Sequence, residues 1–177
     1  MQKVFITSDT HFNHKNIIKY CNRPFDSVDE MNNVLIDNWN KSIDNNDIII
    51  HLGDFGFNGY CPNSLQQIVA NLRGRKWLIL GNHDKKTLGF WEELGFKYVF
   101  RKPIILHNII LSHKPILKPK MLNIHGHIHN KELKNKSKNH ICVCVEKTNY
   151  YPILSEVLTK KQISINNVSI INNPNYI

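Results

Sequence analysis

A short polar motif placed directly after an apolar run is the feature that most constrains this chain. The clearest case is the turn Gly81–Asp84, with sequence GNHD, which comes immediately after the apolar residues 77–80. Most of four similar motifs also follow an apolar, β-branched run; they are Asp9-Thr10-His11, Gly53-Asp54, Ser112-His113 and Gly126-His127-Ile128-His129. Ligands bind at the carboxyl ends of strands in α/β folds. The pattern therefore predicts strand ends that bring Asp, His and Asn side chains together in one metal site.

The order of the predicted elements indicates the fold class. Strands are expected at 4–8, 47–52 and 77–80, alternating with helices at 13–20, 27–39, 62–72 and 88–94. The second half is hairpin-like, with strands at 104–106, 109–111, 121–124 and 140–145, a helix at 155–161 and an Asn-rich end at 163–177 with a last strand and a loose tail. Alternation favours a parallel sheet and hairpins favour antiparallel strands. We therefore predict an α/β fold in which two mixed sheets pack together between helices.

Chain length, apolar runs and cysteines bound the class of protein. A chain of 177 residues is long enough for one domain that buries about 70% of its unfolded surface, so we expect a single domain over 1–177. No apolar run reaches the roughly 18 residues of a membrane span, and no signal-peptide core follows the N-terminus. The four cysteines include no Cys-x-x-Cys pair, which argues against a zinc ribbon, and Cys142 and Cys144 are expected to face the same side of a strand. These features predict a soluble cytoplasmic protein with reduced thiols and no membrane partner; the oligomeric state stays open.

The charge of the chain favours an anionic partner. The formal net charge is +9 at pH 7, which suits a phosphate ester or a nucleic acid. Lysines gather at 114–120 and 131–138, beside two of the histidine motifs, where they could attract an anion, although such runs more often form solvated loops. The abundance of Lys, Asn and Ile is equally typical of an AT-rich genome, including that of a phage whose protein acts in the host cytoplasm.

The motif residues supply the ligands of a pair of divalent ions. Two ions about 3.5–4 Å apart need roughly six or seven N and O ligands, one of which bridges them. Asp54 is the candidate bridge, and the candidate ligands are Asp9, His11, Asp54, Asn82, His113, His127 and His129. Imidazole and carboxylate together suit Mn, which we prefer, or Fe, Zn and Ni, better than Mg or Ca. Such a pair lowers the pKa of a bridging water for attack on phosphorus, and His83 would then protonate the leaving oxygen.

These motifs, in this order, resemble those of the calcineurin-like metallophosphoesterase superfamily, whose pattern is D-x-H, G-D, G-N-H-D, a later H and G-H-x-H. The match runs from Asp9 to His129. The resemblance implies a four-layer α/β/β/α sandwich, with His83 as proton donor and Asp84 as support for its turn. It further implies a first ion on Asp9, His11, Asp54 and His129, and a second on Asp54, Asn82, His113 and His127.

The chain departs from that pattern after the Gly53-Asp54 motif. Many members continue with a second Asp and an Arg, where this chain has Phe57 and Asn58. Arg23 is the candidate replacement because its fork suits phosphate oxygens, with a surface ion pair as an equal alternative. Asp84 or a substrate group would then orient His83. The expected substrate-binding residues are therefore Arg23, Asn82 and His83.

Two further features flank the second motif. The aromatic segment 55–60 is expected to wall the substrate pocket. His51, inside the preceding strand, fits a hydrogen-bonded core histidine better than a group that supports a metal ligand.

The resemblance implies a metal-dependent phosphodiesterase or phosphatase that acts on a nucleotide or a similar small phosphate ester. We favour a diesterase because a proton donor matters most for a poor leaving group. The chain lacks the large insertions of several branches and resembles small stand-alone bacterial and phage members. A nuclease on DNA or RNA is the first alternative, favoured by the charge and opposed by the lack of a recognition domain. A catalytically silent binding scaffold is the second, opposed by the complete ligand set.

Overall fold

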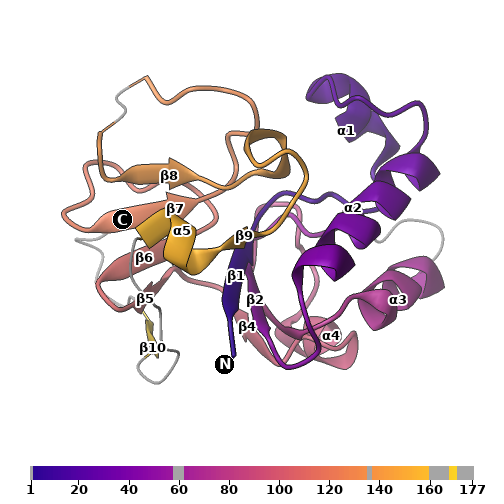
Figure 1. Ribbon diagram of the computed structural model, residues 1–177, viewed down its shortest axis with the longest axis horizontal. Helices are drawn as coiled ribbons and strands as arrows, with labels where there is room; N and C mark the ends of the chain where they lie inside the picture. The colour runs from indigo at the N-terminus through magenta and orange to yellow at the C-terminus, as the bar shows by residue number, and fades with distance from the viewer. Residues whose placement is uncertain (1, 58–61, 135–136, 160–167, 171–177) are drawn as a thin grey trace.

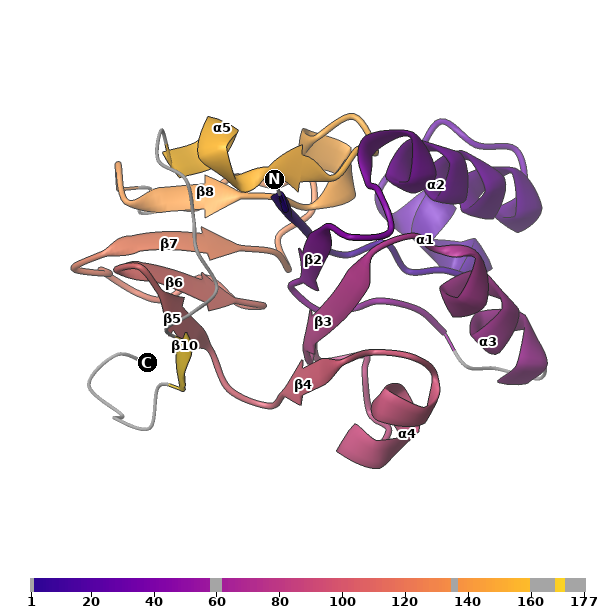
Figure 2. The same cartoon turned by 60° about the horizontal axis from the view of Figure 1, so that its bottom comes forward.

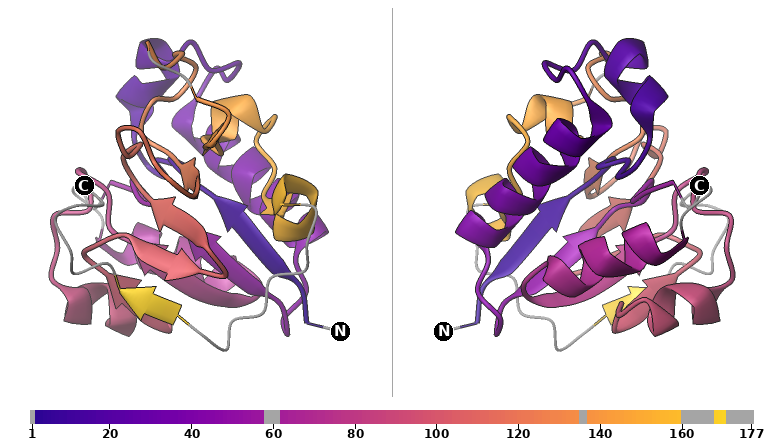
Figure 3. Two further views of the ribbon diagram at one scale, coloured as in Figure 1. Left: turned by 90° about the vertical axis from the view of Figure 1, so that its left-hand side faces the viewer. Right: turned by 90° about the vertical axis from the view of Figure 1, so that its right-hand side faces the viewer.

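Two mixed sheets lie face to face, and helices cover the outer side of one of them (Figures 1 and 2). The structure is a computed structural model that describes residues 2–57, 62–134, 137–159 and 168–170. Figure 3 shows the second sheet in front in its left view and helices in front of the first sheet in its right view. The predicted α/β sandwich of two mixed sheets is confirmed.

The first sheet is mainly parallel and contains five strands in the order β4-β3-β2-β1-β9. Its parallel strands are β1 (Val4–Thr7), β2 (Ile48–His51), β3 (Arg75–Ile79) and β4 (Tyr98–Phe100), and β9 (Ile153–Leu154) is antiparallel to β1. Parallel neighbours need crossover connections. Helices supply them here: α1 (Lys15–Tyr20), α2 (Val28–Ser42), α3 (Pro62–Asn71) and α4 (Leu88–Glu93).

The second sheet also has five strands, in the order β10-β5-β6-β7-β8. They are β5 (Ile104–Leu106), β6 (Ile109–Ser112), β7 (Leu122–His125), β8 (His140–Cys142) and β10 (Val168–Ile170). Strands β6, β7 and β8 are parallel, while β5 pairs antiparallel with β6 and β10. The predicted hairpin is confirmed: His107 and Asn108 have φ of 50° and 62°, so this two-residue turn adopts positive φ without a glycine.

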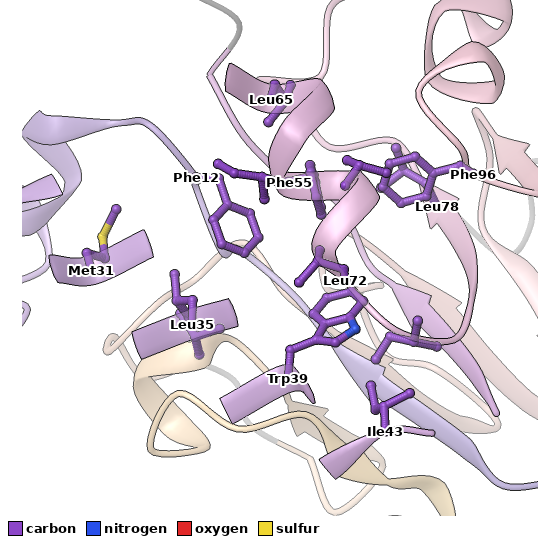
Figure 4. Packing of buried hydrophobic residues seen from close by; sticks show 14 of the residues in the cluster. Phe12, Met31, Leu35, Trp39, Ile43, Phe55, Leu65, Leu72, Leu78 and Phe96 are labelled. Atoms are coloured by element: carbon purple, nitrogen blue, oxygen red, sulfur yellow. The ribbon is translucent and has the colours of Figure 1, made fainter. Parts of the chain in front are cut away.

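Alternation along the strands of the first sheet separates two hydrophobic cores. Val4 and Ile6 face the second sheet, together with Ile48, Ile50, Trp77 and Ile79. Phe5 faces the helices, where it packs with Ile49, Leu78 and the buried face of α2. That face carries Met31, Leu35 and Trp39, spaced as an amphipathic helix requires, and Ser27 caps the helix by accepting from the Glu30 N–H (3.1 Å). Figure 4 shows Trp39 beside Leu72 of the segment that follows α3.

The predicted outer layer of helices over the second sheet is not seen in the described residues, where a loop packs on that face. Within the described residues, its outer face packs against the loop after β6, through Ile116 on Ile110. Helix α5 (Ser155–Thr159) lies beside β9, and its Leu158 packs against the core between the sheets. In the described part of the chain no helix is long and apolar enough to cross a membrane.

Short elements account for the differences from the predicted secondary structure. Strands β4 and β9 were not predicted, because three and two residues carry too little periodicity. The strand predicted at 140–145 ends at Cys142, and a 3-10 turn, η1 (Val145–Lys147), follows. Cys142 and Cys144 do share a side, with their Sγ atoms 3.3 Å apart. Cys21, Cys142 and Cys144 are free, and Cys61 lies outside the described residues.

Candidate metal centre

The seven predicted ligands come together at one edge of the two sheets. Each lies just beyond the carboxyl end of a strand that has parallel neighbours: β1, β2 and β3 in the first sheet, β6 and β7 in the second. The segments after β1 and β8 join across the sheets through a parallel bridge between Ser8 and Cys144. Five strand ends therefore meet at this edge, as the motif pattern predicted.

The first candidate group contains Asp9, His11 and His129, whose possible ligand atoms all lie within 4.8 Å of one another. His129 Nε2 is 3.7 Å from Asp9 Oδ1. Burial, reinforced by Arg23 and the nearby histidines, lowers the pKa of His11, so its imidazole is neutral and able to bind an ion. Burial also lowers the pKa of His129, but hydrogen bonds with Cys21 and Glu146 outweigh it and raise that pKa to about 10. An ion that binds His129 therefore displaces a proton.

The second candidate group contains Asp54, His113 and His127, which also lie within 4.8 Å of one another by their ligand atoms. Asn82 joins it, because its Oδ1 is 3.0 Å from His113 Nε2. His127 Nδ1 lies 3.2 Å from the same His113 nitrogen. Burial lowers the pKa of His127 to about 4, which keeps this imidazole neutral at ordinary pH.

One oxygen of Asp54 adjoins both groups. Asp54 Oδ2 is 3.6 Å from His11 Nε2 and 3.5 Å from His113 Nε2. The other oxygen, Oδ1, accepts the His83 backbone N–H at 2.8 Å, which fixes the carboxylate in place. This is the geometry that a bridging ligand requires.

The donor chemistry fits a metal ion. Asp9 Oδ1 and His11 Nε2 are buried and have no hydrogen-bond partner among the described residues. His113 Nδ1 lies 2.8 Å from the Leu52 carbonyl, so Nδ1 donates to that oxygen and Nε2 is the nitrogen that can bind an ion. That nitrogen faces the oxygens of Asn82 and Asp54. Converging acceptors of the Asp, Asn and His types call for a divalent cation between them.

The ligand loops hold strained backbone. Five of the seven candidate ligands have φ between 50° and 72°: Asp9, His11, Asp54, His127 and His129. Such residues cost on the order of 1–3 kcal/mol each and cluster at functional sites. Cross-braces stabilise them here, because Asp9 N donates to the Gly53 carbonyl (3.0 Å) and His127 N donates to Asp9 Oδ2 (2.9 Å).

Two glycines of the motifs are needed for close approach. A Cβ on Gly81 would collide with the Asp54 carboxylate, and one on Gly126 would collide with Ser8 Oγ and the Asp9 carboxylate. The glycines therefore let two backbone turns come against two candidate ligands.

Asp84 ties the turns together. Its carboxylate accepts the backbone N–H groups of Asp54 (2.7 Å), Gly81 (2.8 Å) and Phe55 (3.0 Å). Burial raises the pKa of Asp84 to about 6, although these hydrogen bonds lower it. Asp84 thus supports the turn that carries His83. Among the described residues, its carboxylate makes no hydrogen bond to the His83 ring, so it does not orient that ring directly.

Arg23 faces inward, which corrects the expectation that it binds substrate. It is 4% exposed. Its guanidinium donates to the carbonyls of Asp9 (2.7 Å) and Thr10 (2.8 Å), to Met31 Sδ, and through Nε and Nη2 to Glu146 Oε1 (2.9 and 2.7 Å). These contacts use all five of its hydrogens. The guanidinium therefore binds the loop that carries Asp9 and His11, and it is not free to bind a phosphate.

Glu146 is the site residue that the sequence analysis missed. The same Oε1 lies 3.0 Å from His129 Nδ1, so a carboxylate orients a candidate ligand whose Nε2 faces Asp9. Burial favours protonation of Glu146, but the His129 hydrogen bond and the Arg23 charge hold its pKa below the ordinary value. Glu146 does follow a buried run, residues 143–145, which was the available signal. It is a single acidic residue outside any motif and gave no prediction.

Three predictions remain: those for His83, for His51 in strand β2, and for the aromatic segment 55–60. His83 is accessible, with its side chain 55% exposed and Nε2 4.0 Å from Asp54 Oδ2. His51 is a core histidine: its Nδ1 accepts the Gly53 N–H (3.1 Å) and its Nε2 lies 3.0 Å from Thr10 Oγ1. Of the predicted aromatic wall, Phe55 belongs to the core, Phe57 is exposed, and residues 58–60 lie outside the described residues.

The fold and the site define a class. Two adjoining groups of His, Asp and Asn at the strand ends of a two-sheet α/β sandwich are the arrangement of a metallophosphoesterase. The chain belongs to the calcineurin-like phosphoesterase family, whose model matches residues 2–168. Members of this family hydrolyse phosphoric esters with divalent metal ions, so the general form of the predicted activity is confirmed.

The chain is also similar to several relatives and solved structures. The chain is 38% identical over 172 residues to the uncharacterized protein MJ1445 of Methanocaldococcus jannaschii, covering 90% of this chain and 91% of that one. It is 33% identical over 86 residues to the gene 66 protein of Mycobacterium phage L5, covering 48% and 41%. The structure of AQ665 from Aquifex aeolicus, a protein of unknown function, has a TM-score of 0.73 at 28% identity and covers 90% and 99%. Nuclease MPE of Pseudomonas putida shares the fold alone, with a TM-score of 0.51 at 19% identity and coverage of 71% and 61%.

Proposed function

We propose that the protein is a phosphodiesterase that uses two divalent ions, preferably Mn, to hydrolyse a nucleotide or a similar small phosphate ester. The observation that carries the proposal is the position of Asp54 Oδ2, within 3.6 Å of a ligand nitrogen in each candidate group. A carboxylate shared in this way is the requirement of a two-ion centre.

The proposed roles follow from the geometry. Asp9, His11, Asp54 and His129 would hold one ion, and Asp54, Asn82, His113 and His127 the other. When bound, such ions activate water and bind phosphate oxygens. His83 Nε2, on an exposed side chain next to Asp54, holds the proton that passes to the leaving oxygen. Asp84 keeps that turn in place through three backbone hydrogen bonds.

The test compares a diester with a monoester that share one leaving group. The full chain, loaded with Mn, Fe, Zn or Ni in turn, is assayed on bis(p-nitrophenyl) phosphate and on p-nitrophenyl phosphate. We expect turnover of the diester and loss of activity in Asp54→Asn. His83→Ala should lose little activity on these p-nitrophenyl esters, because p-nitrophenolate leaves without a proton, and should lose roughly 10²- to 10⁴-fold on a diester with an alkyl leaving group. Asp37→Asn, an exposed carboxylate on α2, is the matched control and should leave the rate unchanged. Full activity of Asp54→Asn at limiting metal would refute the shared-carboxylate mechanism.

A nuclease is the second candidate function, favoured by the net charge of +9. The structural likeness to nuclease MPE concerns the fold and does not decide the substrate. Salt separates the two readings, because a nuclease that contacts many phosphates loses affinity steeply as salt rises. We expect KM for a small diester to change little with salt. If the metal-loaded chain hydrolyses neither the small phosphate esters nor DNA or RNA, the result would point to a catalytically silent binding scaffold.

A further inference from the structure

Three side-chain rings lie in contact beside the candidate centre, with the outer two exposed; we name Tyr20, His14 and Phe57 the aromatic ledge. The His14 ring stacks on Phe57, with centroids 5.7 Å apart and planes at 26°. Tyr20 meets His14 edge-on at 6.4 Å. Tyr20 is 72% exposed and Phe57 56%. Aromatic side chains that are held by ring contacts yet open to solvent offer a surface for a planar ring such as a nucleobase.

The ledge lies on the side of the proposed proton donor. The His14 ring is 6.2 Å from the His83 ring, and His14 Nδ1 is 3.4 Å from His11 Nδ1. His83 delivers its proton to the oxygen that leaves phosphorus. The group attached to that oxygen is therefore the one that meets the ledge.

A separate cavity of about 540 Å³ adjoins the second candidate group. Asn82 and His113 form its border with the centre, and its wall includes Pro103, Pro115 and Leu117. That volume falls within the range of roughly 300–1,000 Å³ typical of small-ligand sites. The cavity therefore has room for an organic group attached to the same phosphate.

Two cations belong to this cavity. Arg101 and Lys114 both line it, and both are exposed. Within the described residues neither takes part in an ion pair, so their charges are available to a ligand. An apolar wall with two cations suits an organic group that carries its own negative charge.

Resting on the proposed phosphodiesterase function, we infer that the site holds both organic substituents of a phosphodiester at once. The leaving substituent stacks on the aromatic ledge, and the retained substituent, a nucleoside with a further phosphate, occupies the cavity beside Asn82 and His113. Water adds its oxygen to phosphorus and releases one proton to the solvent, from which His83 is later reprotonated, and the bond from phosphorus to the ledge-side oxygen breaks. That oxygen takes the proton from His83, while the new phosphomonoester stays on the cavity side. A monoester would fill the ledge and leave the cavity without a ligand.

The experiment varies the retained group while the leaving group stays p-nitrophenolate. The substrates are methyl p-nitrophenyl phosphate, deoxythymidine 5′-(p-nitrophenyl phosphate), and the same nucleotide with a 3′-phosphate, assayed with the Mn-loaded full chain. We expect KM to fall along this series. Arg101→Ala should raise KM roughly tenfold for the 3′-phosphorylated substrate only, and Arg101→Lys should restore most of it. Arg75→Ala, an exposed arginine at the amino end of β3, is the matched control.

The ledge is tested in the same series. Phe57→Ala and Tyr20→Ala should raise KM for all three substrates, by roughly 5- to 100-fold for the loss of ring stacking. Tyr98→Ala, an exposed aromatic of β4, should not. The KM for a dinucleotide is then compared with the KM for a longer strand that has the same terminal nucleotides. A lower KM for the dinucleotide supports a small substrate, and a lower KM for the strand supports a nucleic-acid end.

The assays distinguish failure of the phosphodiesterase proposal from failure of the two-substituent site. If the intact chain turns over no substrate with any metal, the phosphodiesterase function itself is wrong. If it turns over all three substrates with equal KM, and Arg101→Ala changes none of them, the function stands and the two-substituent site is overturned.

Discussion

Replacement of Glu146 by glutamine separates the charge of this residue from its shape. One oxygen, Oε1, receives the Arg23 guanidinium (2.7 Å) and lies 3.0 Å from His129 Nδ1. Removing the charge weakens three charge-assisted hydrogen bonds, two from Arg23 and one from His129, where such a bond is typically worth about 1.5–3 kcal/mol. Groups that orient a metal-binding histidine typically contribute 10- to 100-fold in metal affinity. We therefore expect Glu146→Gln to weaken the binding of one ion by roughly that factor and to lower the free energy of unfolding by about 3 kcal/mol.

The assay is a calorimetric titration with Mn, paired with urea unfolding of the metal-free chain. Glu132→Gln is the matched control: Glu132 is 66% exposed and pairs with Lys147, so its loss should cost less than about 1 kcal/mol. The result that refutes the reasoning is an unchanged affinity for both ions in a variant that is less stable. Glu146 would then brace Arg23 without orienting His129.

Two further predictions concern pH and backbone packing. Burial lowers the pKa of His51 to about 3, whereas the unfolded chain protonates this residue near 6.5. Its contribution to stability is therefore complete above pH 6.5 and is lost as pH falls toward 3, about 2 kcal/mol between pH 8 and 5. His51→Gln should flatten the pH dependence of urea unfolding by that amount, and an identical slope would contradict the assignment. Gly126→Ala should displace Asp9 and reduce the Mn retained per chain after dialysis, measured by mass spectrometry. Gly89→Ala, where an added Cβ meets nothing within 4 Å, should retain all of it; equal retention in both would show that the close approach is dispensable.

Some predictions succeeded because their evidence was local in the chain. Strands β1, β2, β3, β6 and β7 were visible as apolar runs, and the amphipathic face of α2 as a spacing of four residues from Met31 to Leu35 and from Leu35 to Trp39. The His107-Asn108 turn was placed by the strands on either side of it. Strands β4 and β9 were missed because pairing with a neighbouring strand, rather than their own pattern, makes them strands.

The sequence by itself determined the family, the two-sheet fold and the residues that gather at the candidate centre, because each motif joins a strand to its polar turn within a few residues. Only the tertiary structure decided the partners of those residues. Arg23 and Glu146 are 123 positions apart, and their contact turns a predicted phosphate ligand into a brace for His129. His14 and Phe57 likewise meet only because the loops after β1 and β2 lie side by side. Contacts between distant segments depend on how the sheets pack, and no local pattern in the chain records that packing.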